Sequence, residues 1–422
     1  MMRIDILTIF PSIFDSFLGE SLLSKGIEKG LIEFHLHDIR KYSTDKHRKV
    51  DDMPYGGGAG MVMSPQPIVD ALRGIKGSGE PGRTLLLSPG GKPFTQETAE
   101  RFSREKRLIL VCGRYEGIDQ RVRDGFVDEE ISIGDFVMNG GEVAAMAVIE
   151  SVFRLIPGAV GSEESVELES FHRNLLEHPH YTRPEDFEGM KVPSVLLSGN
   201  HKEIEKWRGE KALERTEAVR PDILERGLDE IRQNIKFSMA LVHYPVLGKE
   251  GETITGSITT LDVHDFSRIG KTYSAETVYV ITPVEDQQRL INRLCRHWTD
   301  SEILKELDGR RTEALDIVKV VPSVDAMLKD AKKRGRKIKI LATSAVLAPN
   351  AVSPARWLKS VQEGEEWIVL YGTAYGLAPE LIERADAVLE PVSGRGEFNH
   401  LPVRGASAII TDRLLGNLRR QK

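Results

Sequence analysis

The sequence predicts an α/β protein of more than one domain, and three observations support this fold class. Apolar strands alternate with helical stretches over the first 157 residues, which is typical of an α/β fold. Two of the predicted strands end in glycine-spaced loops, and a similar strand and loop recur near the C-terminus. The length of 422 residues exceeds what one hydrophobic core usually serves, so we expect two or three domains.

Five strands and one long helix are predicted in the first 157 residues. The helix after Gly141 places Met146, Ile149, Phe153 and Ile156 on one apolar face, and Pro157 and Gly158 end it. The predicted strands are Arg3–Ile9, Ile32–His37, Thr84–Ser88, Leu108–Cys112 and Glu130–Ile133.

A polar stretch from Gly158 to Glu169 is predicted to be a loop or linker. Residues 170 to about 235 indicate a small helical domain, with proline and glycine at its turns. A third domain is expected to begin near Phe237 with the apolar run SMALV, which predicts a new strand. The predicted domains are therefore residues 1–160, 161–236 and 237–422.

Two glycine-rich loops in the first domain indicate a ligand site. The run LILVCGRYEGID begins at Leu108, and SIGDFVMNGG begins at Ser132. The spacing from Gly113 to Gly117 is G-x-x-x-G, which matches neither the dinucleotide fingerprint nor a P-loop. Since glycine lets a ligand approach the backbone closely, these loops predict a nucleoside-like ligand held by main-chain groups.

The C-terminal part repeats this pattern. The segment IVLYGTAYGL at 368–377 aligns with ILVCGRYEGI at 109–118, and a second strand, loop and helix follow in each copy. Two glycines four residues apart often recur by chance, but the matching flanking elements favour a second α/β unit of the same kind.

Composition indicates a soluble, cytoplasmic protein. Two cysteines cannot form a disulfide framework, and no apolar run approaches the ~20 residues of a membrane span. The net charge of −6 argues mildly against a nucleic-acid partner. The stretch His201–Arg215 is nearly neutral, so charge alone favours a solvated helix there.

The first 235 residues closely resemble the TrmD family, the bacterial tRNA (guanine-N1)-methyltransferases of the SPOUT class. The resemblance rests on the two glycine-rich runs and on PYGGGAGM (54–61), LLLSPGGKPF (85–94), PHYTRP (179–184) and VLLSGNHKEIEKWR (195–208). It implies a trefoil-knotted α/β domain, S-adenosylmethionine in the knotted loops, and a homodimer with active sites at the subunit interface. It also implies a helical tRNA-binding domain and methyl transfer to N1 of guanosine-37, 3′ of the anticodon.

The C-terminal part resembles a family of SPOUT-like RNA methyltransferases, found alone or fused to the tRNA enzyme. Its LDVHDFSRIGKTY (261–273) is similar to an early SPOUT motif, with Arg268 where RNA-contacting arginines occur. One reading is a second methyltransferase for another RNA. The alternative is a non-catalytic RNA-binding or dimerisation module, which the lack of an identifiable arginine–carboxylate pair favours. A nucleotide hydrolase is poorly supported, because it would need a basic residue and metal-binding carboxylates near the loops, and the GGGAG segment offers neither.

Methylation of guanine N1 needs a base for the N1 proton and a donor for charge on O6. The resemblance assigns Arg154 as the donor and position 169 as the base. The family usually has aspartate at 169, whereas this chain has Glu169; Glu167 is a possible substitute. Alternatively, Glu169 caps the following helix.

The resemblance also assigns the binding residues. Glu116 is expected to bind the edge of the target guanine. The expected S-adenosylmethionine site comprises Leu87, Ser88, Pro89, Gly113, Tyr115, Gly117, Ile133, Gly134, Asp135, Phe136, Val137, Met138, Gly140 and Gly141. A second such site is expected at Gly372, Gly376, Leu377, Asn399 and Leu401.

Three further expectations concern phosphate and metals. His47 and Arg48 are candidate phosphate contacts, although an exposed solvated pair is nearly as plausible. The loop Pro54–Gly60 is predicted to allow close approach at the RNA or subunit surface. The histidines lack metal-ligand spacing, so no metal site is predicted, and the residues do not decide whether Mg²⁺ assists.

Overall fold

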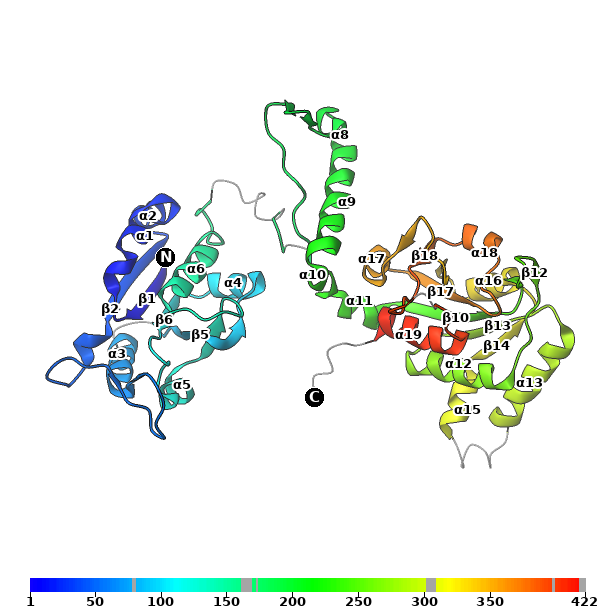
Figure 1. Cartoon of the computed structure of the whole chain (residues 1–422), viewed down its shortest axis with the longest axis horizontal. Coiled ribbons are helices and arrows are strands. Elements are labelled where there is room, and N and C mark those ends of the chain that lie inside the picture. Colours follow the sequence, from blue (N-terminus) through cyan, green and yellow to red (C-terminus); the bar gives the residue numbers. More distant parts are fainter. Residues whose placement is uncertain (78–80, 161–168, 172–173, 301–308, 397–398, 417–422) are drawn as a thin grey trace. The chain divides into compact units, whose positions relative to one another are not determined.

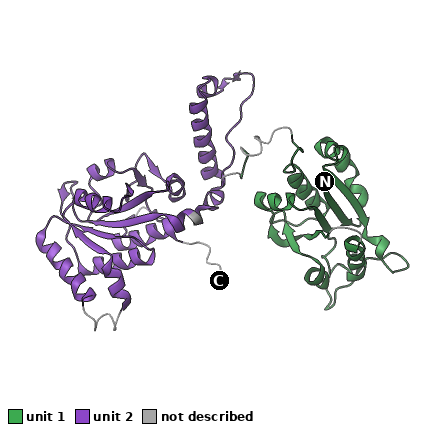
Figure 2. Ribbon diagram, turned by 180° about the vertical axis from the view of Figure 1, so that it is seen from behind, with its two compact units in different colours: residues 1–172 green, residues 173–422 purple. Residues whose placement is uncertain are grey.

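The computed structural model describes residues 1–422 except 78–80, 161–168, 172–173, 301–308, 397–398 and 417–422. The chain divides into two compact units, Met1–His172 and Arg173–Lys422 (Figure 2). Most of the segment predicted as a helical domain thus lies in the second unit. The finer division into three domains stays a prediction.

The first unit is a three-layer α/β structure (Figure 1). Its strands are β1 (Met2–Thr8), β2 (Ile32–Asp38), β3 (Asp51–Asp52), β4 (Val62–Met63), β5 (Arg83–Pro93), β6 (Arg107–Cys112) and β7 (Glu129–Ser132). Its helices are η1 (Pro11–Phe14), α1 (Asp15–Gly19), α2 (Ser21–Glu28), η2 (Ile39–Tyr42), α3 (Pro65–Gly77), α4 (Gln96–Ser103), α5 (Gln120–Phe126) and α6 (Glu142–Phe153).

The main sheet of this unit is parallel, in the order β2-β1-β6-β5-β7. Side chains alternate between its faces. Leu108 and Leu110 pack under α4 and α6, whereas Ile109 and Val111 pack under α3 and α5. Strands buried on both faces are rich in apolar residues, as in β6. All five predicted strands are confirmed, although β5 continues to Pro93 beyond its predicted end at Ser88. The predicted end of the long helix was wrong, because the helix stops at Phe153, before Pro157.

The second unit begins with a helical segment and continues as a larger α/β body. The helical segment contains β8 (Asp186–Phe187), β9 (Met190–Lys191), α8 (Ser194–Leu197), α9 (His201–Val219), α10 (Pro221–Glu225) and α11 (Leu228–Asn234). The strands of the body are β10 (Lys236–Val242), β11 (Val246–Leu247), β12 (Thr253–Ile254), β13 (Val278–Ile281), β14 (Val318–Val321), β15 (Lys337–Ala342), β16 (Ala351–Val352), β17 (Glu365–Gly372) and β18 (Ala387–Leu389). Its helices are α12 (Thr260–Thr272), α13 (Glu285–Thr299), α15 (Gly309–Asp316), α16 (Val324–Lys332), α17 (Pro354–Ser360), α18 (Pro379–Glu383) and α19 (Val403–Leu415).

The body repeats the sheet of the first unit. Its main sheet is parallel in the order β14-β13-β10-β17-β15-β18-β16. Five neighbouring strands of this sheet, β13, β10, β17, β15 and β18, correspond in this order to β2, β1, β6, β5 and β7 of the first unit. In both sheets the chain visits these five places in the same sequence. Strand β6 corresponds to β17, and α6 corresponds to α19. The internal repeat predicted from 109–118 and 368–377 is therefore confirmed at the level of topology.

The helical segment shares a core with this body. Leu224 of α10 and Leu228 of α11 are about 1% exposed and join the cluster that contains Trp357 of α17. Arg232 donates a hydrogen bond to the carbonyl of Leu414 at 3.3 Å, and Ser353 bonds Glu217 at 2.9 Å. The end of the helical segment is thus held against α17 and α19.

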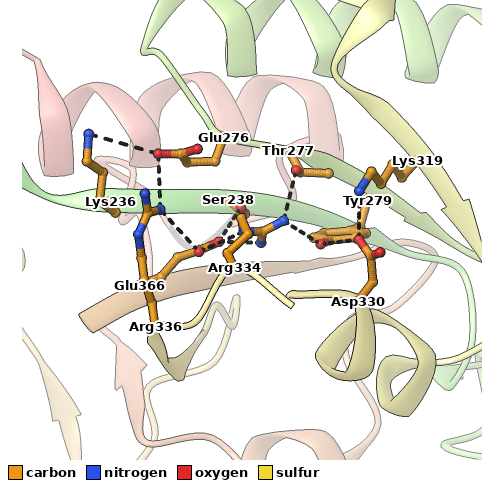
Figure 3. A network of polar contacts seen from close by, with 10 residues as sticks. All are labelled: Lys236, Ser238, Glu276, Thr277, Tyr279, Lys319, Asp330, Arg334, Arg336 and Glu366. Carbon is orange, nitrogen blue, oxygen red and sulfur yellow. Dashed lines mark hydrogen bonds and ion pairs between the residues drawn. The ribbon is translucent and has the colours of Figure 1, made fainter. Parts of the chain in front are cut away.

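Each sheet also contains a buried carboxylate that arginine neutralises. In the second unit, fully buried Glu366 accepts hydrogen bonds from Arg334 and from Ser238 (Figure 3). Arg334 reaches Tyr279, whose hydroxyl bonds Asp330 at 3.0 Å. Ser238, Tyr279 and Glu366 lie near the amino ends of β10, β13 and β17, respectively. The network therefore fixes the edge of the sheet opposite to the carboxyl ends of these strands.

In the first unit the buried carboxylate is Asp5, on β1, which lies between β2 and β6. It accepts hydrogen bonds from Arg3 (2.9 Å), Arg107 (2.8 Å) and His37 (2.8 Å). Burial alone would raise the pKa of Asp5, but these bonds outweigh burial and hold the pKa well below its usual value. A carboxylate with a depressed pKa stabilises the fold above its unfolded pKa, and this contribution is lost as the pH falls.

We therefore expect Asp5→Asn to destabilise the first unit by about 3 kcal/mol at pH 7, because buried arginine would lose its partner. The difference from the wild type should shrink as the pH falls below about 4, where the unfolded aspartate begins to bind protons. Urea unfolding at pH 7, 5, 4 and 3 measures this. A difference that stays constant down to pH 3 would contradict the assignment.

Candidate active site

A cavity of about 210 Å³ lies at the carboxyl ends of β5, β6 and β7. Parallel sheets commonly bind ligands at this edge. Ladder pairing between β5 and β7 is interrupted between Leu87 and Lys92, so the intervening loop leaves the sheet. The lining residues are Leu86–Pro89, Gly113–Ile118, Arg123, Ile131–Gly134, Phe136–Gly140 and Ala144.

The two glycine-rich loops are joined to each other by main-chain bonds. The amide of Gly141 donates to the carbonyl of Gly113 at 2.9 Å, and Arg114 pairs with Gly140 as an isolated bridge. A Cβ on Gly141 would lie 2.9 Å from the Cα of Cys112, which is closer than real Cβ contacts. Glycine is therefore required at 141 for the loops to meet and form one wall of the cavity.

The predicted cofactor residues largely coincide with this cavity. All of them line it except Asp135, which is exposed, and Gly141, which supports the wall behind it. Tyr115, Phe136 and Val137 are 52%, 54% and 85% exposed, so the rim of the cavity is apolar. That these residues hold a nucleoside cofactor remains a prediction.

Glu116 also lines the cavity, and the glycine loop Pro54–Gly60 reaches it. The amide of Glu116 donates to the carbonyl of Met61 at 3.0 Å. A Cβ on Gly60 would lie 2.4 Å from Oε1 of Glu116. The loop predicted for close approach therefore approaches the Glu116 carboxylate, and Gly60 leaves room for that side chain.

Sequence reasoning missed the ion pairs that support the cavity. Glu142 is 1% exposed and accepts from Arg114 at 3.0 Å and from the Thr8 hydroxyl at 2.8 Å. Arg123, which lines the cavity, pairs with Glu130 at 2.6 Å. The sequence contained one signal for these pairs, because Glu142 directly follows Gly141. A carboxylate that is buried at such a position needs a cationic partner.

Arg154 and Glu169 form a bidentate ion pair in which both nitrogens of the guanidinium donate to the two carboxylate oxygens. The hydrogen bond to Glu169 is the main reason that the pKa of Arg154 is raised. Both side chains are about one-third exposed, so the pair is accessible. Neither residue lines the cavity of its own chain, and Glu167 lies outside the described residues.

The second unit has a corresponding cavity. It is lined by residues that include Gly372, Gly376, Asn399 and Leu401, as predicted, whereas Leu377 is buried and pairs with Val246 instead. The two G-x-x-x-G loops have the same backbone. The φ angles are 59° and 122° at Tyr115 and Gly117, and 53° and 111° at Ala374 and Gly376.

No arginine–carboxylate pair corresponding to Arg154 and Glu169 was identified from the sequence of the second unit, but the structure contains a pair at the start of α19 rather than at the end of the helix. Arg404 at the start of α19 bonds Asp262 at 3.1 Å and Asp265 at 2.8 Å, and Asp262 lines the cavity. Arg404 and the two aspartates are more than 130 residues apart in the chain, so no local pattern could have indicated this pair.

The remaining predicted residues lie on the surface. His47, Arg48 and Arg268 are exposed. Within the described residues, no group of three or more His, Cys, Asp or Glu side chains is arranged to hold a metal ion. The helices described here include none long and apolar enough to cross a membrane.

Comparison with known families assigns both units to one class, the RNA methyltransferases. The model of a family described as SAM-dependent RNA methyltransferase matches residues 236–416. The model described as tRNA (Guanine-1)-methyltransferase TrmD matches residues 2–226, which include the first cavity, Arg154 and Glu169.

The chain belongs to the tRNA (guanine-N1)-methyltransferase family. Relatives with that description from Oleidesulfovibrio alaskensis and Nitratidesulfovibrio vulgaris are 46% and 47% identical over 431 and 429 residues, covering 99% of this chain and 100% of each relative. A relative with the same description from Anoxybacillus flavithermus is 54% identical over 225 residues, which are 53% of this chain and 92% of that relative.

Proposed function

We propose that the first unit transfers a methyl group from S-adenosylmethionine to N1 of guanosine-37 in tRNA. The observation that carries the proposal is the combination of a glycine-walled cavity, Glu116 on its lining and the exposed Arg154–Glu169 pair within the same family-matched region. S-adenosylmethionine would supply an electrophilic methyl group, so no metal is needed for its activation.

The Arg154–Glu169 pair suits the edge of guanine. N1–H is a donor and the neighbouring O6 is an acceptor, whereas the pair offers a carboxylate acceptor beside a guanidinium donor. Guanine would insert between the two side chains. Glu169 would then take the N1 proton while Arg154 stabilises the negative charge that develops on O6.

We propose that the active site is completed in a homodimer. The base and the donor lie outside the cavity of their own chain, so a second copy would bring them to it. The exposed face of α6 includes Val143, which is 54% exposed, and the cavity rim contributes Val137. These apolar side chains next to the cavity support a subunit contact there.

Three finer proposals concern architecture, tRNA and compartment. The strand order of both units is consistent with a trefoil knot in each, with the glycine loops as the knotted segments. Helix α9 would bind tRNA phosphates through lysine and arginine on its exposed surface.

The substrate implies a cytoplasmic location. Mg²⁺ is not required by the proposed steps.

The test is methyl transfer from labelled S-adenosylmethionine to unmodified tRNA with guanosine 3′ of the anticodon, followed by nucleoside separation. We expect N1-methylguanosine from the full chain, and none from tRNA whose guanosine-37 is replaced by adenosine. Absence of N1-methylguanosine from both tRNAs would overturn the proposal.

Glu116→Gln should weaken guanine binding, because an amide loses the charge that strengthens hydrogen bonds to the base edge. We expect kcat/KM for tRNA to fall about 10- to 100-fold, equivalent to about 1.5–3 kcal/mol, with little change in the Kd for S-adenosylmethionine. Steady-state kinetics and calorimetric titration measure these quantities. The control is Glu97→Gln, an exposed carboxylate on α4. Unchanged kcat/KM in Glu116→Gln would remove Glu116 from guanine recognition.

A further inference from the structure

The cavity of the second unit contains a carboxylate that its family description does not assign. Asp262 lies in the first turn of α12, and its side chain is 19% exposed on the cavity wall. One oxygen is bonded by Nε of Arg404 at 3.1 Å, and the other accepts from the hydroxyl of Thr259. The carboxylate is thus held in one orientation while it faces the cavity.

Arg404 reaches Asp262 from a different element. It lies in the first turn of α19, the helix that corresponds to α6, and Val403 beside it lines the cavity. Its other contact, Asp265 at 2.8 Å, is one turn along α12. The guanidinium therefore ties the start of α12 to the start of α19 at the cavity.

The residue that corresponds to Glu116 in the second G-x-x-x-G loop is Tyr375. It lines the cavity and is 59% exposed. An exposed aromatic ring offers a stacking surface to any nucleobase, worth about 1–3 kcal/mol per base. The loop thus has an aromatic ring at the place where the first unit has the Glu116 carboxylate, and this position offers stacking instead of a charged acceptor.

The second unit also carries a basic surface that suits a polyanionic acceptor. A shallow groove on α13 is lined by Arg289, Asn292, Arg293, Arg296 and His297. Arg289 is ion-paired with Asp286 at 2.7 Å, whereas Arg293, Arg296 and His297 on the same helix face would contact phosphates. Unpaired RNA is the nucleic acid whose bases are free to stack on aromatic side chains.

We propose that the second unit is an independent methyltransferase site for an unpaired RNA nucleotide, in which Asp262 is the catalytic base and Tyr375 stacks on the acceptor base. The acceptor carries a removable proton, on a ring N–H or a ribose hydroxyl. Its nitrogen or oxygen forms the new bond to the methyl carbon, and the bond from carbon to the S-adenosylmethionine sulfur breaks with its electron pair remaining on sulfur. The acceptor proton moves to the Asp262 carboxylate. Arg404 is a positioning residue that acts through Asp262.

The test uses the full chain, labelled S-adenosylmethionine and total RNA from cells depleted of this protein, with separation of the labelled nucleosides. We expect a second labelled product distinct from N1-methylguanosine. It should persist in Glu169→Ala and fall by about 10²- to 10⁴-fold in Asp262→Asn. N1-methylguanosine should be unchanged in Asp262→Asn, so the two sites are scored separately in one reaction.

Thermal unfolding of Asp262→Asn is measured in parallel, because Asp262 also belongs to the N-terminal cap of α12. Tyr375 provides a second variant away from that cap. Tyr375→Ala should raise KM for the RNA about tenfold, as expected for loss of one stacking contact, whereas Tyr375→Phe should preserve it. A product that persists within threefold in a folded Asp262→Asn protein would overturn the role of the base. If the second cavity binds S-adenosylmethionine but N1-methylguanosine is the one labelled product, the proposal of a second methyltransferase site would be overturned.

The positioning role of Arg404 has its own readout. Arg404→Gln should lower kcat for the second product without changing the Kd for S-adenosylmethionine, and Arg404→Lys should restore part of the kcat because it keeps the positive charge. Equal loss in both variants with normal folding would mean that Arg404 does not act through its charge on Asp262.

Discussion

Glu169→Ala is expected to lower kcat for N1-methylguanosine formation by about 10²- to 10⁴-fold, the usual contribution of a positioned general base. Glu169→Gln should lose a similar factor, because the amide keeps a hydrogen bond to Arg154 but cannot take the N1 proton. The Kd for S-adenosylmethionine should not change, since Glu169 does not line the cavity. Single-turnover methyl transfer at saturating tRNA measures the effect.

Glu169→Asp is the informative control, because the family usually has aspartate at this position. Both side chains keep the carboxylate and differ by one methylene, so we expect this variant to remain within about tenfold of the wild type, the range that a small displacement of a reacting group allows. Near-normal kcat in Glu169→Gln would assign Glu169 to orientation of Arg154 rather than to proton transfer.

The fold could be predicted where burial imposes a pattern on the sequence. Strands such as β6 are buried on both faces and β6 is apolar from Leu108 to Cys112, and the glycine loops after β6 and β17 need left-handed backbone. The end of α6 was misjudged because Ile156 continues the apolar spacing after the helix has ended at Phe153. Ile156 packs on the same core without being helical, so spacing alone could not reveal the boundary.

The candidate site could be predicted from sequence only where local segments make it. Within each of the loops at 113–117 and 133–140, residues that are neighbours in the chain line the cavity, with Asp135 as the exception. Contacts between distant segments gave no such signal. Arg404 meets Asp262 across the α/β body, and Gly60 meets Glu116 because a separate loop folds over it. Both depend on tertiary packing that no periodicity encodes.

Two inactive variants are expected to regain activity when they are mixed. In Gly113→Leu, a larger side chain would fill the first cavity, where a Cβ at 113 meets only the Ile118 side chain, at 3.5 Å. Glu169→Ala would lack the base. If each site combines the cavity of one subunit with the Arg154–Glu169 pair of the other, a mixed dimer contains one intact site. Random pairing makes half of the dimers mixed, so about one quarter of wild-type activity should return.

Recovery requires subunit exchange, which is followed by mixing differently tagged variants and isolating the doubly tagged dimer. That dimer should have about half of the wild-type activity, because one of its two sites is intact. The control is a dimer of two Glu169→Ala chains in which each chain carries one of the same two tags, and it should stay inactive. An inactive mixed dimer would mean that Glu169 serves the cavity of its own chain.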